Sequence, residues 1–594
     1  MSTAQPATGA EDWLPGAAAQ AAAWLASMQT SEGLWPNLLE AGPHLDVLYA
    51  LLTWFLDWKQ HPFRTSHREA WAERLLARQN TDGGFAACPQ GRSRADATFE
   101  AYLALRLAGV DPREDRVRHA AQWLASQGGL EACGAPTLLK YFWAGAAGNR
   151  AVPAVAPEHY FFVDYSRSPA LQRQQNVCAA ALAIAAYLRG GPTLSETAWP
   201  TLESEFPPLT GQRALPRSGS RAAGLITQWA RIAPRPLRDP IVFRTYDAMV
   251  CEALRWPTLP VALHAALAVR AANGRGSHAL DHFERVISLL GPVEPDSPPR
   301  PVDFGVRTAA MAALALALWG ARSSAAGTAA ALKSRFREPS RMPGANGLRA
   351  GWPLGDLHAE PDVETTAWAL LALRSTGALA DDMMQTAVAG LLAVQRDDGG
   401  WGASGGDPSS PDITATVVEA LVACGQERGS PPVRRAIQYL EESQHAEAWW
   451  PAARGICRLY GTAMALRGLR AAGYDDREAP VLRAGEWIRS IQNADGGWGE
   501  EAESCPSGEF RAAASTPAQT AWALLGLLAG GDTDSESVRR GFAWLAANQR
   551  PEGGWSASGP TLAGVAYAPC LMDPLGATLW PLLALRARLD RSSD

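Results

Sequence analysis

Two carboxylic side chains, two residues apart, begin an apolar and alanine-rich segment of this chain. Residues 361–367 read Pro-Asp-Val-Glu-Thr-Thr-Ala, which places Asp362 and Glu364 at the expected start of a helix. Burial raises the pKa of a carboxyl group, and a neighbouring carboxylate raises one member of such a pair further. The positive end of a helix opposes this by stabilising the anion. If the two groups share a proton, the pair can serve as a general acid near neutral pH.

The same residues also have an ordinary structural interpretation. Asp362 follows a proline directly before apolar residues, which is typical of a helix N-cap. Residues 411–414, Pro-Asp-Ile-Thr, repeat this pattern, and Ser-Thr-Pro at 515–517 begins a third copy. Glu364 sets the first copy apart, because its counterpart in the second copy is Thr414. The comparison within the chain therefore favours Glu364 over Asp362 as the residue that carries chemistry.

A repeated turn predicts the elements that position these carboxyl groups. A glutamine is followed six residues later by an aromatic residue, with glycine one or two positions before it, at Gln29, Gln79, Gln395, Gln492 and Gln549. A weaker copy starts at Gln444, and steps of about 50 residues fit a pair of helices with their turns. Glycine supplies backbone angles that other residues resist. We interpret the glutamine and the aromatic residue as structural ties between repeats, not as catalytic groups.

The segments on either side of each turn predict the fold class. An amphipathic helix precedes the glutamine, and a small-residue helix that is apolar nearly all round follows the turn. A helix that is apolar on every side is buried on every side, so inner and outer helices should alternate in an all-α, double-shell α/α barrel. A chain of 594 residues is long enough for two such domains.

The repeat also predicts the domain organisation. Gln127 marks a further weak copy, with Cys133 at the aromatic position, and the period then fades until Gln395. The proline-rich stretch 295–301 is the best candidate for a boundary. We therefore expect an inserted N-terminal barrel over residues 40–295. Residues 1–39 together with 296–594 should form the C-terminal barrel, which carries Glu364.

Together, the five turns, the chain length and the small-residue helices resemble the squalene–hopene and oxidosqualene cyclase family. The resemblance is strongest where Gln492-Asn-Ala-Asp-Gly-Gly-Trp is followed by residues 514–526 and then by the Gln549 turn. Residues 361–367 are similar to that family's Asp-x-Asp-Asp-Thr-Ala signature, with Glu364 at the middle position and Thr365 in place of the last aspartate. The resemblance implies a class II terpene cyclase, which starts cyclisation by protonating a carbon–carbon double bond.

Site roles follow from this resemblance. Glu364 is the expected acid, Asp362 its hydrogen-bonding partner and Asp412 a further carboxylate close by. Aromatic faces would stabilise the carbocations that form. The residues expected to line the substrate cavity are Trp352, Trp368, Arg454, Tyr460, Trp522 and Tyr567.

Several positions depart from the family pattern where substrate should lie. Thr416 replaces a histidine that supports the acid in the family, and Val306 and Arg454 stand where the family has cavity tryptophans. Squalene is therefore not the expected substrate, and a shorter or functionalised isoprenoid (a diterpenoid, sesquiterpenoid or meroterpenoid precursor) fits better. Two alternatives stay open: an isoprenoid-modifying enzyme that starts without protonation, and a non-catalytic lipid-binding or scaffold protein on the same barrel.

Composition limits the other function classes. The net charge of −6 gives no electrostatic basis for binding nucleic acid. The eight cysteines are scattered, which favours neither a zinc ribbon nor a disulfide-stapled secreted fold. No signal peptide or membrane-spanning run is recognisable. We expect a cytoplasmic protein with an isoprenoid ligand and no metal or cofactor, unless a diphosphate substrate brings Mg²⁺. Attachment to the cytoplasmic membrane surface and a homodimer stay open.

Overall fold

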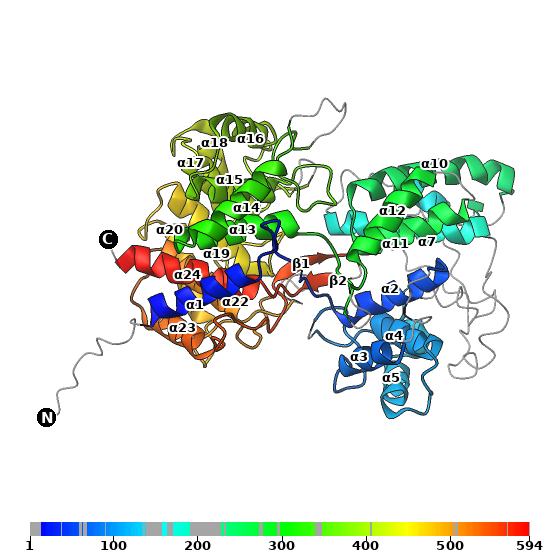
Figure 1. Cartoon of the computed structure of the whole chain (residues 1–594). Coiled ribbons are helices and arrows are strands. Elements are labelled where there is room, and N and C mark those ends of the chain that lie inside the picture. The colour runs from blue at the N-terminus through cyan, green and yellow to red at the C-terminus, as the bar shows by residue number, and fades with distance from the viewer. Residues whose placement is uncertain are drawn as a thin grey trace. The chain divides into compact units, whose positions relative to one another are not determined.

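The computed structural model describes residues 13–592 and divides them into two units. It leaves out residues 37, 59–61, 63–67, 90, 135–136, 138–156, 163–169, 190–225, 227–228, 231–232, 273–276, 294–296, 339–346, 404–406, 503, 505–508 and 567. Unit 1 comprises Met1–Leu39, Asp303–Ala563 and Met572–Asp594, and unit 2 comprises Glu40–Val302 and Gly564–Leu571. Figure 1 labels the elements of both units. The chain thus leaves unit 1 after Leu39 and re-enters it at Asp303.

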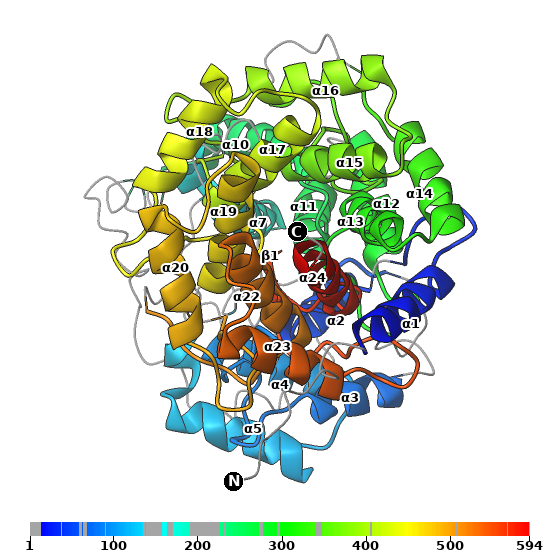
Figure 2. The ribbon, with the colours of Figure 1, turned by 90° about the vertical axis from the view of Figure 1, so that its left-hand side faces the viewer.

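Unit 1 is a double-shell helical barrel. Its inner helices are α13 (Gly305–Leu318), α15 (Val363–Ser375), α17 (Pro411–Ala423), α19 (Cys457–Ala471), α22 (Pro517–Ala529) and α24 (Gly576–Ser592). Each packs against the next, and α24 packs against α13, which closes the ring seen in Figure 2. The outer helices are α1 (Leu14–Ser27), α14 (Arg322–Ser334), α16 (Asp381–Ala393), α18 (Pro431–Glu442), α20 (Ala479–Ser490) and α23 (Glu536–Ala547).

Burial follows the expected difference between the two shells. Every residue of α15 from Val363 to Leu373 is buried, whereas α18 buries only Val433, Ala436, Ile437 and Leu440. A helix in the inner shell meets other helices on all sides, while an outer helix needs a single apolar stripe. The all-α fold class predicted from the sequence is confirmed.

Unit 2 has the same two-shell construction in its described part. Its most buried helices are α2 (Pro43–Phe55), α4 (Ala95–Leu107), α7 (Ala170–Arg189) and α11 (Leu259–Ala271). Around them lie α3 (Arg68–Ala77), α5 (Asp115–Ser126), α10 (Arg235–Arg255), α12 (Ser277–Leu290) and the 3₁₀ segments Gly129–Ala132 and Pro157–Phe162. A short hairpin, β1 (Leu562–Val565) and β2 (Ala568–Leu571), is the one two-stranded sheet of the described chain.

A disulfide in unit 2 was not expected from the sequence. Cys88, in the turn region after Phe85, is bonded to Cys570 of β2 across a sequence separation of 482 residues. Scattered cysteines gave no indication of pairing, because only the fold brings these two to a Cα–Cα distance of 5.5 Å.

The glutamine turns tie neighbouring repeats together, as predicted. Gln492 Nε2 donates to Gly496 O within its own turn (2.8 Å) and to Ser537 O at the start of α23 (2.9 Å). Trp498 Nε1 donates to Ile488 O, at 2.8 Å. Gly496 has a φ of +94°, which a side chain would resist. At Gln549 the second bond runs to Ala17 O of α1 (2.9 Å), so the N-terminal helix is held by the last repeat.

Replacing Gln492 by alanine should therefore lower the free energy of unfolding by about 1–3 kcal/mol, since two hydrogen bonds are lost and two carbonyl groups lose their partner. Chemical denaturation monitored by circular dichroism measures this. Gln385→Ala is the matched control, because Gln385 is exposed on α16. Equal effects of the two substitutions would show that the turn glutamine does not join the repeats.

Candidate active site

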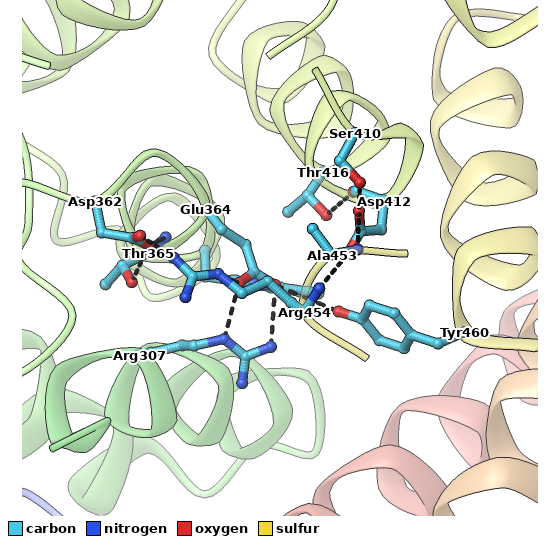
Figure 3. Close-up of polar contacts among 11 residues, drawn as sticks. Arg307, Asp362, Glu364, Thr365, Ser410, Asp412, Thr416, Ala453, Arg454 and Tyr460 are labelled. Atoms are coloured by element: carbon cyan, nitrogen blue, oxygen red, sulfur yellow. Dashed lines mark hydrogen bonds and ion pairs between the residues drawn. The ribbon is translucent and has the colours of Figure 1, made fainter. Parts of the chain in front are cut away.

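The first turns of the inner helices of unit 1 meet at one end of the barrel. Arg307 comes from α13, Glu364 from α15, Asp412 from α17 and Tyr460 from α19 (Figure 3). Because these helices run in the same direction, residues that lie far apart in the sequence reach one cluster. We call Arg307, Asp362, Glu364, Asp412 and Arg454 the carboxyl cluster.

Glu364 lies at the centre of this cluster and is almost completely buried, with 1% of its surface exposed. Arg307, equally buried, donates from Nε to Glu364 Oε2 and from Nη2 to Oε1, both at 3.0 Å. Trp368 Nε1 (3.2 Å) and the Tyr460 hydroxyl (3.3 Å) donate to Oε1. Arg454 Nε lies 3.3 Å from Oε2. Glu364 is therefore surrounded by donors on both of its oxygens.

Asp362 performs the N-cap role that the sequence predicts. Its Oδ1 accepts hydrogen bonds from the Thr365 backbone amide (2.8 Å) and the Thr365 hydroxyl (2.6 Å). Its Oδ2 is ion-paired with Arg454 Nη2. Arg454 therefore lies between Asp362 and Glu364 and contacts both, whereas the two carboxyl groups are not hydrogen-bonded to each other.

Asp412 is held by neutral donors. Its Oδ2 accepts from the backbone amides of Ala453 (3.1 Å) and Arg454 (3.0 Å), and its Oδ1 accepts from the Ser410 hydroxyl. Thr416, at the position of the family's histidine, donates to the Asp412 carbonyl at 2.9 Å and does not touch the carboxyl group. Asp412 thus fixes the segment that carries Arg454.

The three carboxyl groups differ in the direction in which their pKa values are shifted. Burial opposes ionisation of Glu364, but the charges of Arg307 and Arg454 and the hydrogen bonds from Arg307 and Trp368 together outweigh burial and lower the pKa of Glu364 below its ordinary value. For Asp362, burial raises the pKa although the Arg454 charge works against it. Burial likewise raises the pKa of Asp412 against the Ser410 hydrogen bond. The expectation that burial would raise the pKa of Glu364 is wrong for this arrangement, because two arginines that the motif does not reveal stabilise its anion.

An aromatic layer covers Glu364. Trp368, Tyr460, Trp522 and Trp580 are fully buried and meet edge to face, with ring centroids 4.9–6.0 Å apart. Edge-to-face packing is the favoured geometry of aromatic pairs. Two of these rings, Trp368 and Tyr460, donate to Glu364 directly. The predicted lining residues Trp368, Tyr460 and Trp522 are therefore brought together beside the carboxyl cluster.

The other predicted lining residues have different surroundings. The Trp352 indole donates to Leu332 O of α14 (2.7 Å), and the Trp352 backbone amide donates to the Thr366 hydroxyl (3.0 Å). These bonds match those of Trp498, so Trp352 belongs to an unrecognised copy of the structural turn. Arg454 is engaged by the carboxyl groups. Tyr567 lies outside the described residues.

Sequence reasoning missed Arg307, Asp573 and His358. Arg307 is a lone charge in the otherwise apolar helix α13, which was the available signal. Asp573 is buried, accepts from the Gly576 amide (2.9 Å) ahead of α24, and has a pKa raised by burial. Burial lowers the pKa of His358 to about 4, so this histidine is neutral at ordinary pH.

The Asp573→Asn variant tests the burial effect on one carboxyl group, because asparagine is an equally good cap. A raised folded-state pKa stabilises the protein at pH values below the unfolded pKa of about 3.9 and loses this contribution as pH rises through the folded pKa. The stability of the variant relative to the natural chain should therefore increase as pH rises from about 4 to 7. Urea denaturation at several pH values measures this, and a constant difference would contradict it.

A double-shell helical barrel with a buried carboxyl cluster beneath aromatic rings is the arrangement expected of the terpene cyclase class. The squalene-hopene cyclase N-terminal domain matches residues 18–165, and the squalene-hopene cyclase C-terminal domain matches residues 405–589. Squalene–hopene cyclase of Alicyclobacillus acidocaldarius is 30% identical over 596 residues, which cover 90% of this chain and 91% of that protein. The chain belongs to the squalene–hopene cyclase family, and the predicted family assignment is confirmed.

A further curated protein and a solved structure are also similar to this chain. The squalene hopane cyclase of Aspergillus fumigatus is 26% identical over 86% of this chain and 81% of its own length. The solved structure of ent-copalyl diphosphate synthase from Streptomyces platensis has a TM-score of 0.56 at 20% identity, with 97% of this chain and 99% of that chain covered. The latter likeness supports the fold. No described helix has the length and apolar character needed to cross a membrane.

Proposed function

We propose that the chain cyclises an isoprenoid by protonating a terminal carbon–carbon double bond from the carboxyl cluster. The observation that supports this most is the balance of buried charge. Asp362, Glu364 and Asp412 supply three carboxyl groups, while Arg307 and Arg454 supply two guanidinium groups. Ionising all three would leave an uncompensated negative charge in a buried site, which is costly. The cluster is therefore suited to hold one proton.

We assign the stored proton to Asp362 and its delivery to Glu364. Burial raises the pKa of both Asp362 and Asp412, but of these two only Asp362 shares the Arg454 guanidinium with Glu364. Glu364 is the carboxyl group that contacts the aromatic layer. Arg454 contacts both groups, so its withdrawal would remove the cation that favours their ionised forms and allow the proton to reach Glu364. The alkene π electrons then form the new C–H bond, the Glu364 O–H bond breaks, and a carboxylate remains.

The aromatic layer would stabilise the resulting cation. The faces of Trp368, Trp522 and Trp580 attract positive charge, by roughly 2 kcal/mol or more when the cation is desolvated. Protonation itself needs no metal, and a diphosphate substrate would bring Mg²⁺ with its headgroup. Val306 and Arg454, where the family has tryptophans, favour a shorter or functionalised isoprenoid over squalene.

One observation favours an alternative. Glu364 is fully ion-paired, which suits an enzyme that modifies an isoprenoid without strong acid, or a barrel that binds lipid without catalysis. Incubation with farnesyl diphosphate, geranylgeranyl diphosphate, geranylgeranyl dihydroxybenzoate and squalene, followed by mass spectrometry, tests the proposal. We expect a cyclised product from a C15 or C20 chain and none from squalene. Hopene from squalene would overturn the substrate assignment, and no product from any substrate would favour the non-catalytic alternative.

Cytoplasmic location and attachment to a membrane surface belong to the same proposal. The helix α10 exposes Leu237 and Leu254, at 60% and 38%. Such side chains can enter the headgroup region of a bilayer. Co-sedimentation with lipid vesicles, with the Leu237→Glu variant as control, tests this attachment.

A further inference from the structure

A cavity of about 420 Å³ opens at the end of unit 1 opposite the carboxyl cluster. Its apolar wall comes from the middle and C-terminal turns of the inner helices, with Leu314, Leu371, Leu525, Leu528 and Leu583. The carboxyl cluster lies in the first turns of the same helices. The volume falls in the range of about 300–1,000 Å³ that is usual for small-molecule sites. We call it the distal cavity.

The aromatic layer separates the distal cavity from the carboxyl cluster. Trp368 follows Glu364 by one helical turn and precedes the cavity residue Leu371 by another. Arg467, which lines the cavity, places its guanidinium 5.4 Å from the Trp368 ring centroid. The indole nitrogen of the same ring donates to Glu364 (3.2 Å). The distal cavity is thus a second site and not an extension of the first.

Positive charge gathers around the cavity. Its charged lining residues are Glu419, Arg467, Arg470, Arg586, Asp590 and Arg591, which is an excess of two positive charges. Part of that charge has internal partners. Arg467 Nη2 donates to Glu419 Oε1 (2.7 Å), and Arg586 donates to Leu318 O (2.9 Å) and Asp590 Oδ1 (2.7 Å). These pairs hold both guanidinium groups at the cavity wall.

Arginine side chains supply the positive charge of the cavity lining. Among the described residues, Arg467 Nη1 and Arg586 Nε have no hydrogen-bond partner, but both atoms are enclosed and do not face the open cavity. A ligand therefore meets the positive charge of these groups, not a free donor atom. Arginine suits phosphate oxygens especially well. The leucine wall and the excess positive charge complement a molecule with an apolar chain and an anionic oxygen-rich head.

We propose that the distal cavity binds an apolar chain that ends in a phosphate or diphosphate group. The chain lies against the leucine wall, and the positive charge of the lining arginines attracts the phosphate oxygens. A prenyl phosphate and a membrane phospholipid both present this chemistry. The site is independent of the proposed cyclase reaction, so its binding is measured without turnover.

Titration calorimetry with farnesyl monophosphate tests the proposal. The Arg467→Met variant should bind roughly 10- to 100-fold more weakly, because a positive charge is lost and Glu419 is left without its partner at the cavity wall. Ala529→Trp, which fills the cavity from its wall, should abolish binding at this site. Arg434→Met, at an exposed position of α18, should bind like the natural chain. Thermal unfolding of each variant shows that it is folded.

Two further binding measurements identify the anionic group of the ligand and its source. Farnesol should bind much more weakly than farnesyl monophosphate, and equal binding would overturn the anionic head. Vesicles that contain phosphatidic acid, tested in competition, distinguish a phospholipid from a free prenyl phosphate as the source. If neither Arg467→Met nor Ala529→Trp weakens binding of either probe, the distal cavity is not the site and the proposal is wrong.

Discussion

Replacing Arg307 by methionine is expected to lower the free energy of unfolding by about 3–5 kcal/mol at pH 7. Arg307 and Glu364 form a two-bond ion pair in which each side chain is only 1–2% exposed. Methionine has a similar length but leaves a buried carboxylate with much weaker compensation. Much of the cost is that of the uncompensated charge, not of lost packing.

The pH dependence of this effect follows from the lowered pKa of Glu364. A depressed folded-state pKa stabilises the protein above the unfolded value of about 4.3, and this contribution is lost as pH falls through the folded pKa. The deficit of Arg307→Met should therefore be largest above about pH 5 and shrink in acid. Denaturation curves at pH 7 and pH 4 measure the difference.

A double-mutant cycle isolates the pair. Arg307→Met/Glu364→Gln should recover part of the stability, because neither buried charge remains. Arg335→Met is the matched control: Arg335 also forms two bonds with a carboxylate, Asp356, at 2.8 and 2.9 Å, but Asp356 is half exposed. Its loss should cost about 0–1 kcal/mol. If the two single substitutions cost the same, the buried pair does not have the importance assigned to it.

The second large effect concerns turnover. If Glu364 delivers the proton, Glu364→Gln should reduce kcat by about 100- to 10,000-fold with the substrate that the incubations identify. The substitution also leaves Arg307 unpaired, so the double variant with Arg307→Met serves as the control for folding. A kcat much lower in the stably folded double variant than in Arg307→Met alone would show that the carboxyl group, and not the fold, is needed.

Asp362→Asn distinguishes proton storage from capping. Asparagine retains the N-cap bond to Thr365 but cannot store the proton. A large loss of kcat with unchanged stability would support storage, whereas unchanged kcat would limit Asp362 to its structural role. Asp356→Asn, away from the cluster, should leave kcat unaffected.

Much of the fold was predictable because its determinants are local. The Gln492 turn and the apolar helix after it carry their own signals of hydrogen bonding and burial. The Asp362 cap was equally local. The partners of Glu364 were not, since Arg307 and Arg454 lie 57 and 90 residues away and reach it only through the order of the inner helices. Trp352 was misplaced for the same reason, because only the packing against α14 shows where its indole lies.

The pKa of Glu364 shows how much this long-range information changes the chemistry. In the sequence motif, burial was the main influence on the pKa of Glu364 that could be recognised. The structure adds two guanidinium groups, which reverse the direction of the pKa shift of Glu364, whereas burial raises the pKa values of Asp362 and Asp412. Storage and delivery of the proton are therefore divided between two residues in our account.

Cyclisation in D₂O tests the central claim most directly. A reaction that starts by protonation must place one deuterium from solvent on the terminal carbon of the substrate, and mass spectrometry with deuterium NMR of the product locates it. We predict one deuterium at that carbon in the product of the natural chain, and no labelled product from Glu364→Gln/Arg307→Met. A cyclised product that carries no deuterium at the terminal carbon would contradict initiation by the carboxyl cluster.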